Sequence, residues 1–144
     1  MQFWTDQKLI LSFYHHCTRP VCERFELTQA EFDILMFLTN NPEYDTAADI
    51  VRIRLLTKSH VSMAIKNLKK RGFLAASFNE HNKKSMHLMI LPAAQPAVEA
   101  GKAVQKLFQQ QLFKDFTAEE KQQYKHIFEK ICHNARTGMA KTSA

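Results

Sequence analysis

The hydrophobic period of this chain changes at Gly72, and that change constrains the fold more than any other feature. Upstream, between Thr57 and Gly72, apolar residues follow one another at steps of three and four, which predicts a helix with one buried side. Downstream, two short β-prone runs, about Leu74–Phe78 and Met86–Leu91, flank a polar stretch, which predicts a β-hairpin. The sequence therefore places a helix directly before a hairpin.

Helix starts are marked by threonines that are followed, three positions later, by an acidic residue. In such a capping box the two side chains bond free amides of the first turn. Three pairs have this spacing: Thr28 with Glu31, Thr46 with Asp49, and Thr117 with Glu120. Leu27 and Phe32 flank the first pair at the spacing of a hydrophobic staple, and Pro42 ends that helix.

Further helices are predicted at both ends of the chain. The first spans about Asp6–His16 and is expected to stop before the "TRP" sequence. After Pro96 and after Thr117, apolar residues again recur at three- and four-residue steps, so a long helix and a last helix are expected. The predicted fold is mainly α with a small β-hairpin wing: a winged helix-turn-helix with additional N- and C-terminal helices.

The chain carries a net charge of +6, and its positive charge is concentrated in the middle third. Between Ile50 and Val98, nine basic residues stand against one acidic residue, which leaves +8 in this segment and −2 in the rest of the chain. The helix predicted from Thr57 to Gly72 carries five basic residues and no acidic one. A polyanionic partner such as double-stranded DNA explains this imbalance better than solubility alone.

The basic helix has a predicted core side and a predicted outward side. Val61, Ala64, Ile65 and Leu68 fall on the core side, and Gly72 fits the left-handed position that ends a helix. The residues expected to contact DNA are Thr57, Lys58, Ser59, His60, Ser62, Met63, Lys66, Asn67 and Lys70. Small polar side chains would let the backbone approach the DNA closely, and Lys66 or Asn67 is expected to read bases.

The hairpin tip and the turn before the basic helix supply further candidates for DNA contact. His81, Lys83 and Lys84 are expected to reach a neighbouring minor groove or its phosphates. Arg52 and Arg54 are expected to clamp the DNA backbone. The alternatives are a charged tip that keeps the protein in solution and two arginines that point at water.

Several stretches of the sequence resemble, in order and spacing, the MarR (multiple-antibiotic-resistance regulator) family. They are "LTQAEFDILMFL", "TAADIV", "LTKSHVSMAIKNLKKRGFL", the hairpin, and "FTAEEKQQYKHIFEKI". The resemblance implies a homodimeric winged-helix transcription factor, usually a repressor, that binds a palindromic operator. It also implies dimerisation helices in residues 1–26 and 97–135, a DNA-binding domain in residues 27–92, and a flexible tail in residues 136–144.

The same resemblance implies that the segment from Thr57 to Lys66 faces DNA and that Lys83 and Lys84 occupy the wing tip. The chain departs from the family at Met63, where an arginine is common, and at the wing sequence "NEHNKK", where the family has a prominent arginine. These departures concern base preference rather than fold.

Members of the family often release DNA in response to a small aromatic compound or an oxidant, so both are candidate effectors. No residue pattern specifies an aromatic ligand. Cys17 and Cys22 are candidate redox sensors, because Tyr14, His15 and His16 lie nearby and would stabilise a thiolate. The alternative is two ordinary thiols at a helix end. A metal site built from these histidines and cysteines lacks a CxxC or HxxxH pair.

The chain carries no signature of an enzyme. Its three glycines cannot form a glycine-rich phosphate loop, and no HExxH or Ser-His-Asp pattern occurs. No cofactor is therefore expected. Three cysteines, no long apolar run and no signal peptide predict a cytoplasmic protein without a membrane segment. The alternative function is a winged-helix protein–protein interaction module whose basic face binds an acidic partner.

Overall fold

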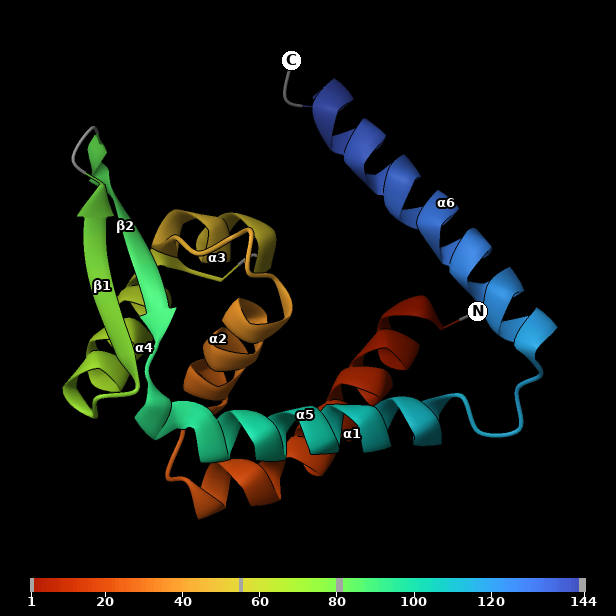
Figure 1. Cartoon of the computed structure of the whole chain (residues 1–144). Helices are drawn as coiled ribbons and strands as arrows, with labels where there is room; N and C mark the ends of the chain where they lie inside the picture. Colours follow the sequence, from red (N-terminus) through yellow and green to blue (C-terminus); the bar gives the residue numbers. More distant parts are fainter. Residues whose placement is uncertain (1, 55, 80–81, 143–144) are drawn as a thin grey trace. The chain divides into compact units, whose positions relative to one another are not determined.

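The computed structural model describes residues 2–54, 56–79 and 82–142, in two compact units, Met1–Phe108 and Gln109–Ala144 (Figure 1). The elements in chain order are α1 (Phe3–Arg24), α2 (Gln29–Asn40), α3 (Ala47–Arg54), α4 (Lys58–Lys70), β1 (Leu74–Asn79), β2 (Asn82–Ile90), η1 (Pro92–Ala94), α5 (Gln95–Leu112) and α6 (Ala118–Thr142). The predicted mainly helical fold with a two-stranded wing is confirmed.

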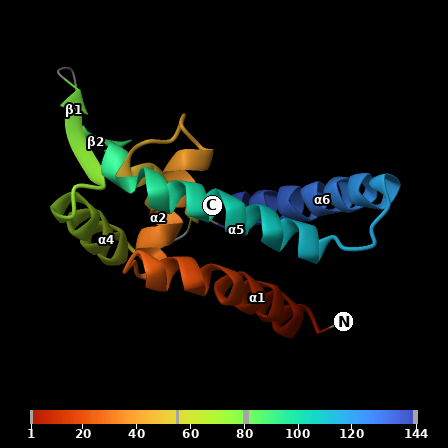
Figure 2. The ribbon, with the colours of Figure 1, turned by 60° about the horizontal axis from the view of Figure 1, so that its bottom comes forward.

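Helix α2 carries the centre of the hydrophobic core of the first unit. Phe32, Ile34 and Leu35 on α2 are each 1% exposed, and they belong to one cluster with Ile50 of α3 and Leu68 of α4. Burying a side chain of this size contributes about 1.5–3 kcal/mol. Figures 1 and 2 show α2 in the middle of this unit, while β1, β2 and α4 lie at one end and the N-terminal end of α1 lies at the other.

Two of the three predicted capping pairs form in full, whereas at Thr46 the described bond is the one from the Asp49 amide to Thr46 Oγ1, over 3.1 Å. The Glu31 amide donates to Thr28 Oγ1 over 3.1 Å, and the Thr28 amide donates to Glu31 Oε1 over 2.9 Å. The same reciprocal pair joins Thr117 and Glu120, over 3.0 and 2.9 Å. These local bonds satisfy amides that the first turn of a helix leaves free, so they place α2 and α6 along the chain.

The change from helix to hairpin occurs at Gly72, as predicted. Gly72 has φ +73°, the left-handed conformation that glycine adopts without steric cost. The Phe73 amide donates to the Leu68 carbonyl over 2.9 Å, and the Gly72 amide donates to the Lys69 carbonyl over 3.0 Å. These are the two bonds of a Schellman motif. The chain then enters an antiparallel pair in which Leu74 lies opposite Ile90 and Phe78 lies opposite Met86.

Three predicted boundaries are wrong. Helix α1 runs on to Arg24 with Pro20 inside it, instead of stopping near His16. A proline removes only one amide donor, and Thr18, beside it, is buried and donates to Gln29 Oε1 over 3.2 Å, so contacts with α2 hold the helix together.

Strand β2 begins at Asn82, four positions before the predicted start. The expected flexible tail from residue 136 is helical through Thr142, because nothing between Arg136 and Thr142 stops the helix: the segment has no proline and one glycine. None of the helices in the described part of the chain has both the length and the hydropathy that a bilayer crossing needs.

Candidate nucleic-acid interface

Helix α4 has one buried side and one exposed side. Val61, Ala64, Ile65 and Leu68 are at most 4% exposed and pack in the core. The residues on the other side are exposed: Lys58, Ser59, His60, Ser62, Met63, Lys66, Asn67, Lys69 and Lys70. The predicted division of this helix is confirmed, whereas DNA contact by its exposed side stays a prediction.

The exposed side of α4 is positively charged, and no acidic residue of the helix neutralises its lysines. The helix contains Lys58, Lys66, Lys69 and Lys70 and no acidic residue. None of the ion pairs within the described residues includes one of these lysines. At the start of the helix, Thr57 Oγ1 accepts from the His60 amide over 3.3 Å, and the remaining free amides add partial positive charge there. The arrangement suits phosphate groups.

Asn67 is hydrogen-bonded to a buried carboxylate on α2, that of Glu31. Asn67 Nδ2 donates to Glu31 Oε2 over 3.2 Å, while Glu31 Oε1 accepts from the Thr28 amide. Glu31 is 4% exposed, so the carboxylate depends on these donors. Glu31 thus joins the start of α2 to α4. Asn67 was expected to read bases, but its amide donor is directed to α2.

Arg71 ties the end of α4 to the end of α1. Its Nη1 donates to the Glu26 carbonyl over 2.8 Å and its Nη2 donates to the Phe25 carbonyl over 2.6 Å. Its guanidinium also lies 4.5 Å above the Phe73 ring. The sequence did not single out Arg71 as a positioning residue. The one local signal was a basic residue directly before the glycine that ends the helix.

Arg52 and Arg54 are both paired with acidic residues, so they do not simply point at water, whereas their contact with the DNA backbone stays a prediction. Arg52 Nη2 lies 2.9 Å from Asp49 Oδ1. Burial opposes ionisation of Asp49, but hydrogen bonds from Arg52 and Thr46 outweigh it and hold the pKa of this carboxyl below its usual value. Arg54 Nη2 lies 3.7 Å from Asp33 Oδ2 on α2.

The wing is anchored to the loop between α2 and α3. His87 Nδ1 lies 2.9 Å from Asp45 Oδ1, and the Leu88 amide donates to the Asp45 carbonyl over 2.7 Å. Thr46 and His87 form a β-bridge beside these contacts. Lys83 and Lys84 lie in β2, where the structure describes their backbone but not their side chains, and His81 lies outside the described residues.

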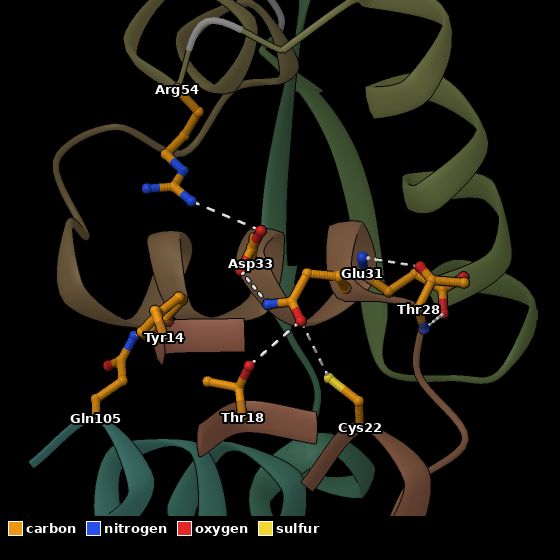
Figure 3. Close-up of polar contacts among 9 residues, drawn as sticks. Tyr14, Thr18, Cys22, Thr28, Glu31, Asp33, Arg54 and Gln105 are labelled. Atoms are coloured by element: carbon orange, nitrogen blue, oxygen red, sulfur yellow. Dashed lines mark hydrogen bonds and ion pairs between the residues drawn. The ribbon is translucent and has the colours of Figure 1, made fainter. Parts of the chain in front are cut away.

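Two groups of polar side chains join α1 to its neighbours, one to α2 and the other to α5 (Figure 3). Gln29 accepts from Thr18 and donates to Asp33 Oδ1 over 3.0 Å, and Gln105 Nε2 donates to the Tyr14 hydroxyl over 2.9 Å. Burial raises the pKa of Asp33, although the bond from Gln29 and the charge of Arg54 act in the opposite direction. The adjoining cavity has a volume of about 90 Å³, well below the roughly 300–1,000 Å³ of typical small-molecule sites.

The two candidate redox cysteines differ in environment. Cys22 is 8% exposed, and burial, reinforced by the charge of Asp33, raises the pKa of its thiol to about 11. This environment opposes the thiolate that a redox sensor needs. Cys17 is partly exposed. Among the described residues, no three or more His, Cys, Asp or Glu side chains are placed to hold a metal ion.

Comparison with known proteins agrees with this architecture. Residues 25–85 match the model of the MarR family. No curated protein sequence matches the chain. The structure is similar to S. aureus MepR in its DNA-binding conformation, with a TM-score of 0.83 and 18% identity over 94% of this chain and 99% of that one.

Two further solved structures have the same fold. A MarR protein from Peptoclostridium difficile gives a TM-score of 0.83 and 18% identity over 99% of this chain and 92% of that one. The S. aureus MepR–DNA complex gives a TM-score of 0.78 and 17% identity over 94% of this chain and 96% of that one. The predicted family resemblance is confirmed.

Proposed function

We propose that this chain, whose residues 25–85 match the model of the MarR family, is a homodimeric transcriptional repressor that binds a palindromic operator in double-stranded DNA. One observation carries the proposal: the exposed side of α4 presents four lysines that form no ion pair with the described acidic residues, next to a wing that is fastened to the same unit. Lysines that neutralise phosphates release counterions, and this release supplies much of the affinity of proteins for DNA.

In the proposed complex, the segment from Ser59 to Lys66 enters a major groove and the wing lies over flanking phosphates. Glu31 and Arg71 hold the C-terminal part of α4 in place: Glu31 bonds it to α2, and Arg71 bonds it to the end of α1. A two-fold dimer then places two copies of α4 in successive major grooves, about 34–36 Å apart.

The dimer is supported by apolar side chains that remain exposed on two helices. On α1, Trp4 is 78% exposed and Leu11 is 54% exposed, and their seven-residue spacing places them on one side of the helix. On α6, in the second unit, Ile127 is 57% exposed and Ile131 is 49% exposed, and they follow each other at a four-residue step. Contiguous exposed apolar surface marks an interface. We assign both surfaces to the contact with a second copy of this chain.

Release from DNA by a small aromatic compound or an oxidant remains part of the proposal. The cavity near Tyr14 and Asp33 has to widen before an aromatic ring can enter it. For an oxidant, Cys17 is the better candidate, because Cys22 is buried. Operator release by hydroperoxide should then disappear in Cys17→Ser, and an unchanged response would exclude Cys17 as the sensor.

The experiment that tests the function is selection of binding sites from a random duplex pool at about 150 mM salt. An enriched inverted repeat with half-sites one helical turn apart supports a dimeric sequence-specific regulator. Repression is then tested with a reporter gene placed behind that repeat. Salt-sensitive binding without enrichment would reject sequence-specific regulation, and a chain that sediments as a monomer at the working concentration would reject the dimer.

A further inference from the structure

The exposed side of α4 has an apolar side chain at its centre. A helix turns by about 100° per residue, so steps of four, three and four place Ser59, Met63, Lys66 and Lys70 in one line along it. All four are exposed, and the line lies opposite the buried side of the helix. Met63 is therefore among the side chains of α4 that project farthest from the core.

No hydrogen bond within the part of the chain that the structure describes gives the side chain of Met63 a role in holding the fold together. It is 67% exposed, and the structure describes the whole of α4, in which Met63 is the one large apolar side chain that solvent reaches. Its neighbours along the line are the short hydroxyl of Ser59 and the flexible Lys66, which leave its thioether room to approach a surface. Methionine is unbranched and adapts to the shape of an apolar contact.

The structure also limits which polar side chains of α4 are available to read bases. Asparagine recognises adenine with an amide N–H and its carbonyl, and one of the two N–H groups of Asn67 Nδ2 donates to Glu31, which holds this side chain toward α2. Recognition of the cytosine amino group needs an acceptor such as a carboxylate, and α4 has no acidic residue. Lys66 remains suited to guanine or phosphate, and Met63 remains without a polar role.

The C5-methyl group of thymine is the apolar group that base pairs present in the major groove. We propose that Met63 is a specificity-determining residue that selects a thymine in each half-site through contact with this methyl group. This inference rests on the proposed function and adds to it the base that one residue recognises.

The test uses the operator obtained by selection and replaces each thymine in turn with deoxyuridine, which removes only the methyl group. With the parent protein, one symmetry-related thymine per half-site should weaken binding by about fourfold per half-site when replaced, the value expected for one buried methyl group. With Met63→Ala, the same replacement should change binding less than twofold.

Met63→Gln separates apolar contact from side-chain length, because it keeps the length and adds a polar amide. It should also lose the discrimination between thymine and uracil. Leu107→Ala is the control, since Leu107 is 58% exposed on α5, outside the surface assigned to DNA, and its replacement should leave the uracil effect, the loss of affinity caused by deoxyuridine, at full size. Each variant changes an exposed side chain, so its thermal unfolding should follow that of the parent.

Two results overturn the inference while the proposed function stands: an operator in which no thymine is sensitive to loss of its methyl group, and a uracil effect that is equally large in the parent and in Met63→Ala. Failure to enrich any sequence overturns the proposed function and the inference together. The outcomes are distinguishable because the selection precedes the base replacement.

Discussion

Asn67 Nδ2 donates a hydrogen bond to Glu31 Oε2 over 3.2 Å, and this bond joins the exposed helix α4 to the capped start of α2. Asn67→Ala should lower the free energy of unfolding by about 1–2 kcal/mol, because it leaves one oxygen of a buried carboxylate without its donor. Urea unfolding measures the difference. Asn134→Ala, at an exposed position within α6, is the control for the higher helix propensity of alanine, and an equal effect in both variants would contradict the prediction.

Two helix ends adopt the left-handed conformation with different residues, Gly72 with φ +73° and Glu26 with φ 53°. Gly72→Ala should lower the free energy of unfolding by about 1 kcal/mol through backbone strain alone, because a Cβ at Gly72 meets nothing within 4 Å. Glu26→Gly should raise it by up to about 1 kcal/mol by relieving the same strain. In thermal or urea unfolding, the two variants should change the free energy of unfolding in opposite directions. A change in the same direction would refute backbone strain as the cause.

Gly101 on α5 allows a close approach to α2. A Cβ added there would clash with Met36 Sδ and lie 3.1 Å from Phe32 Cε2, and both side chains are buried, so the core has to rearrange around it. Gly101→Ala should therefore cost about 1–3 kcal/mol in unfolding free energy.

The matched control is Gly138→Ala, where a Cβ meets nothing within 4 Å inside a helix. This variant should gain about 0.5–1 kcal/mol from the better helix propensity of alanine. If Gly101→Ala were neutral or stabilising, the close approach would not limit the packing of α5.

Asp33 should make the protein less stable as the pH rises. Burial raises the pKa of Asp33 above its ordinary value of 3.8, so the native state holds the proton more tightly than the unfolded chain. The free energy of unfolding then falls as the pH rises from the unfolded-state pKa through the raised one. In Asp33→Asn this component is absent, so its stability relative to the parent should increase over that window in urea unfolding. A difference that stays flat or decreases would show that the pKa of Asp33 is not raised.

Lys66 should contribute to the salt dependence of DNA binding. Lys66→Ala should reduce the slope of log K against log salt by about 0.9, the value for one phosphate contact. Lys102, which lies 3.5 Å from Glu99 on α5, provides the control, and Lys102→Ala should leave the slope unchanged. Binding titrations at several salt concentrations measure both, and identical slopes for the two variants would rule out a phosphate contact by Lys66. Lys83→Ala in the wing is expected to reduce the slope in the same way.

Features that depend on neighbouring residues were predictable from the sequence. The capping pairs Thr28–Glu31 and Thr117–Glu120 form within four residues, so their pattern located two helix starts correctly. The buried side of α4 followed from its period, and the end of α4 followed from Gly72. Pro20 misled the prediction because the tendency of proline to break a helix is local, whereas contact with α2 is not.

The order of the elements, the division of α4 into two sides and the excess of positive charge can all be read from the amino-acid sequence, because each depends on a few adjacent residues or on a sum over them. Which polar groups stay available for a partner depends instead on long-range packing. The partners of Asn67 and Arg71 lie 36 and 45 residues away along the chain, and the partner of Tyr14 lies 91 residues away. Such contacts form when the core brings distant helices together, and no local pattern specifies them.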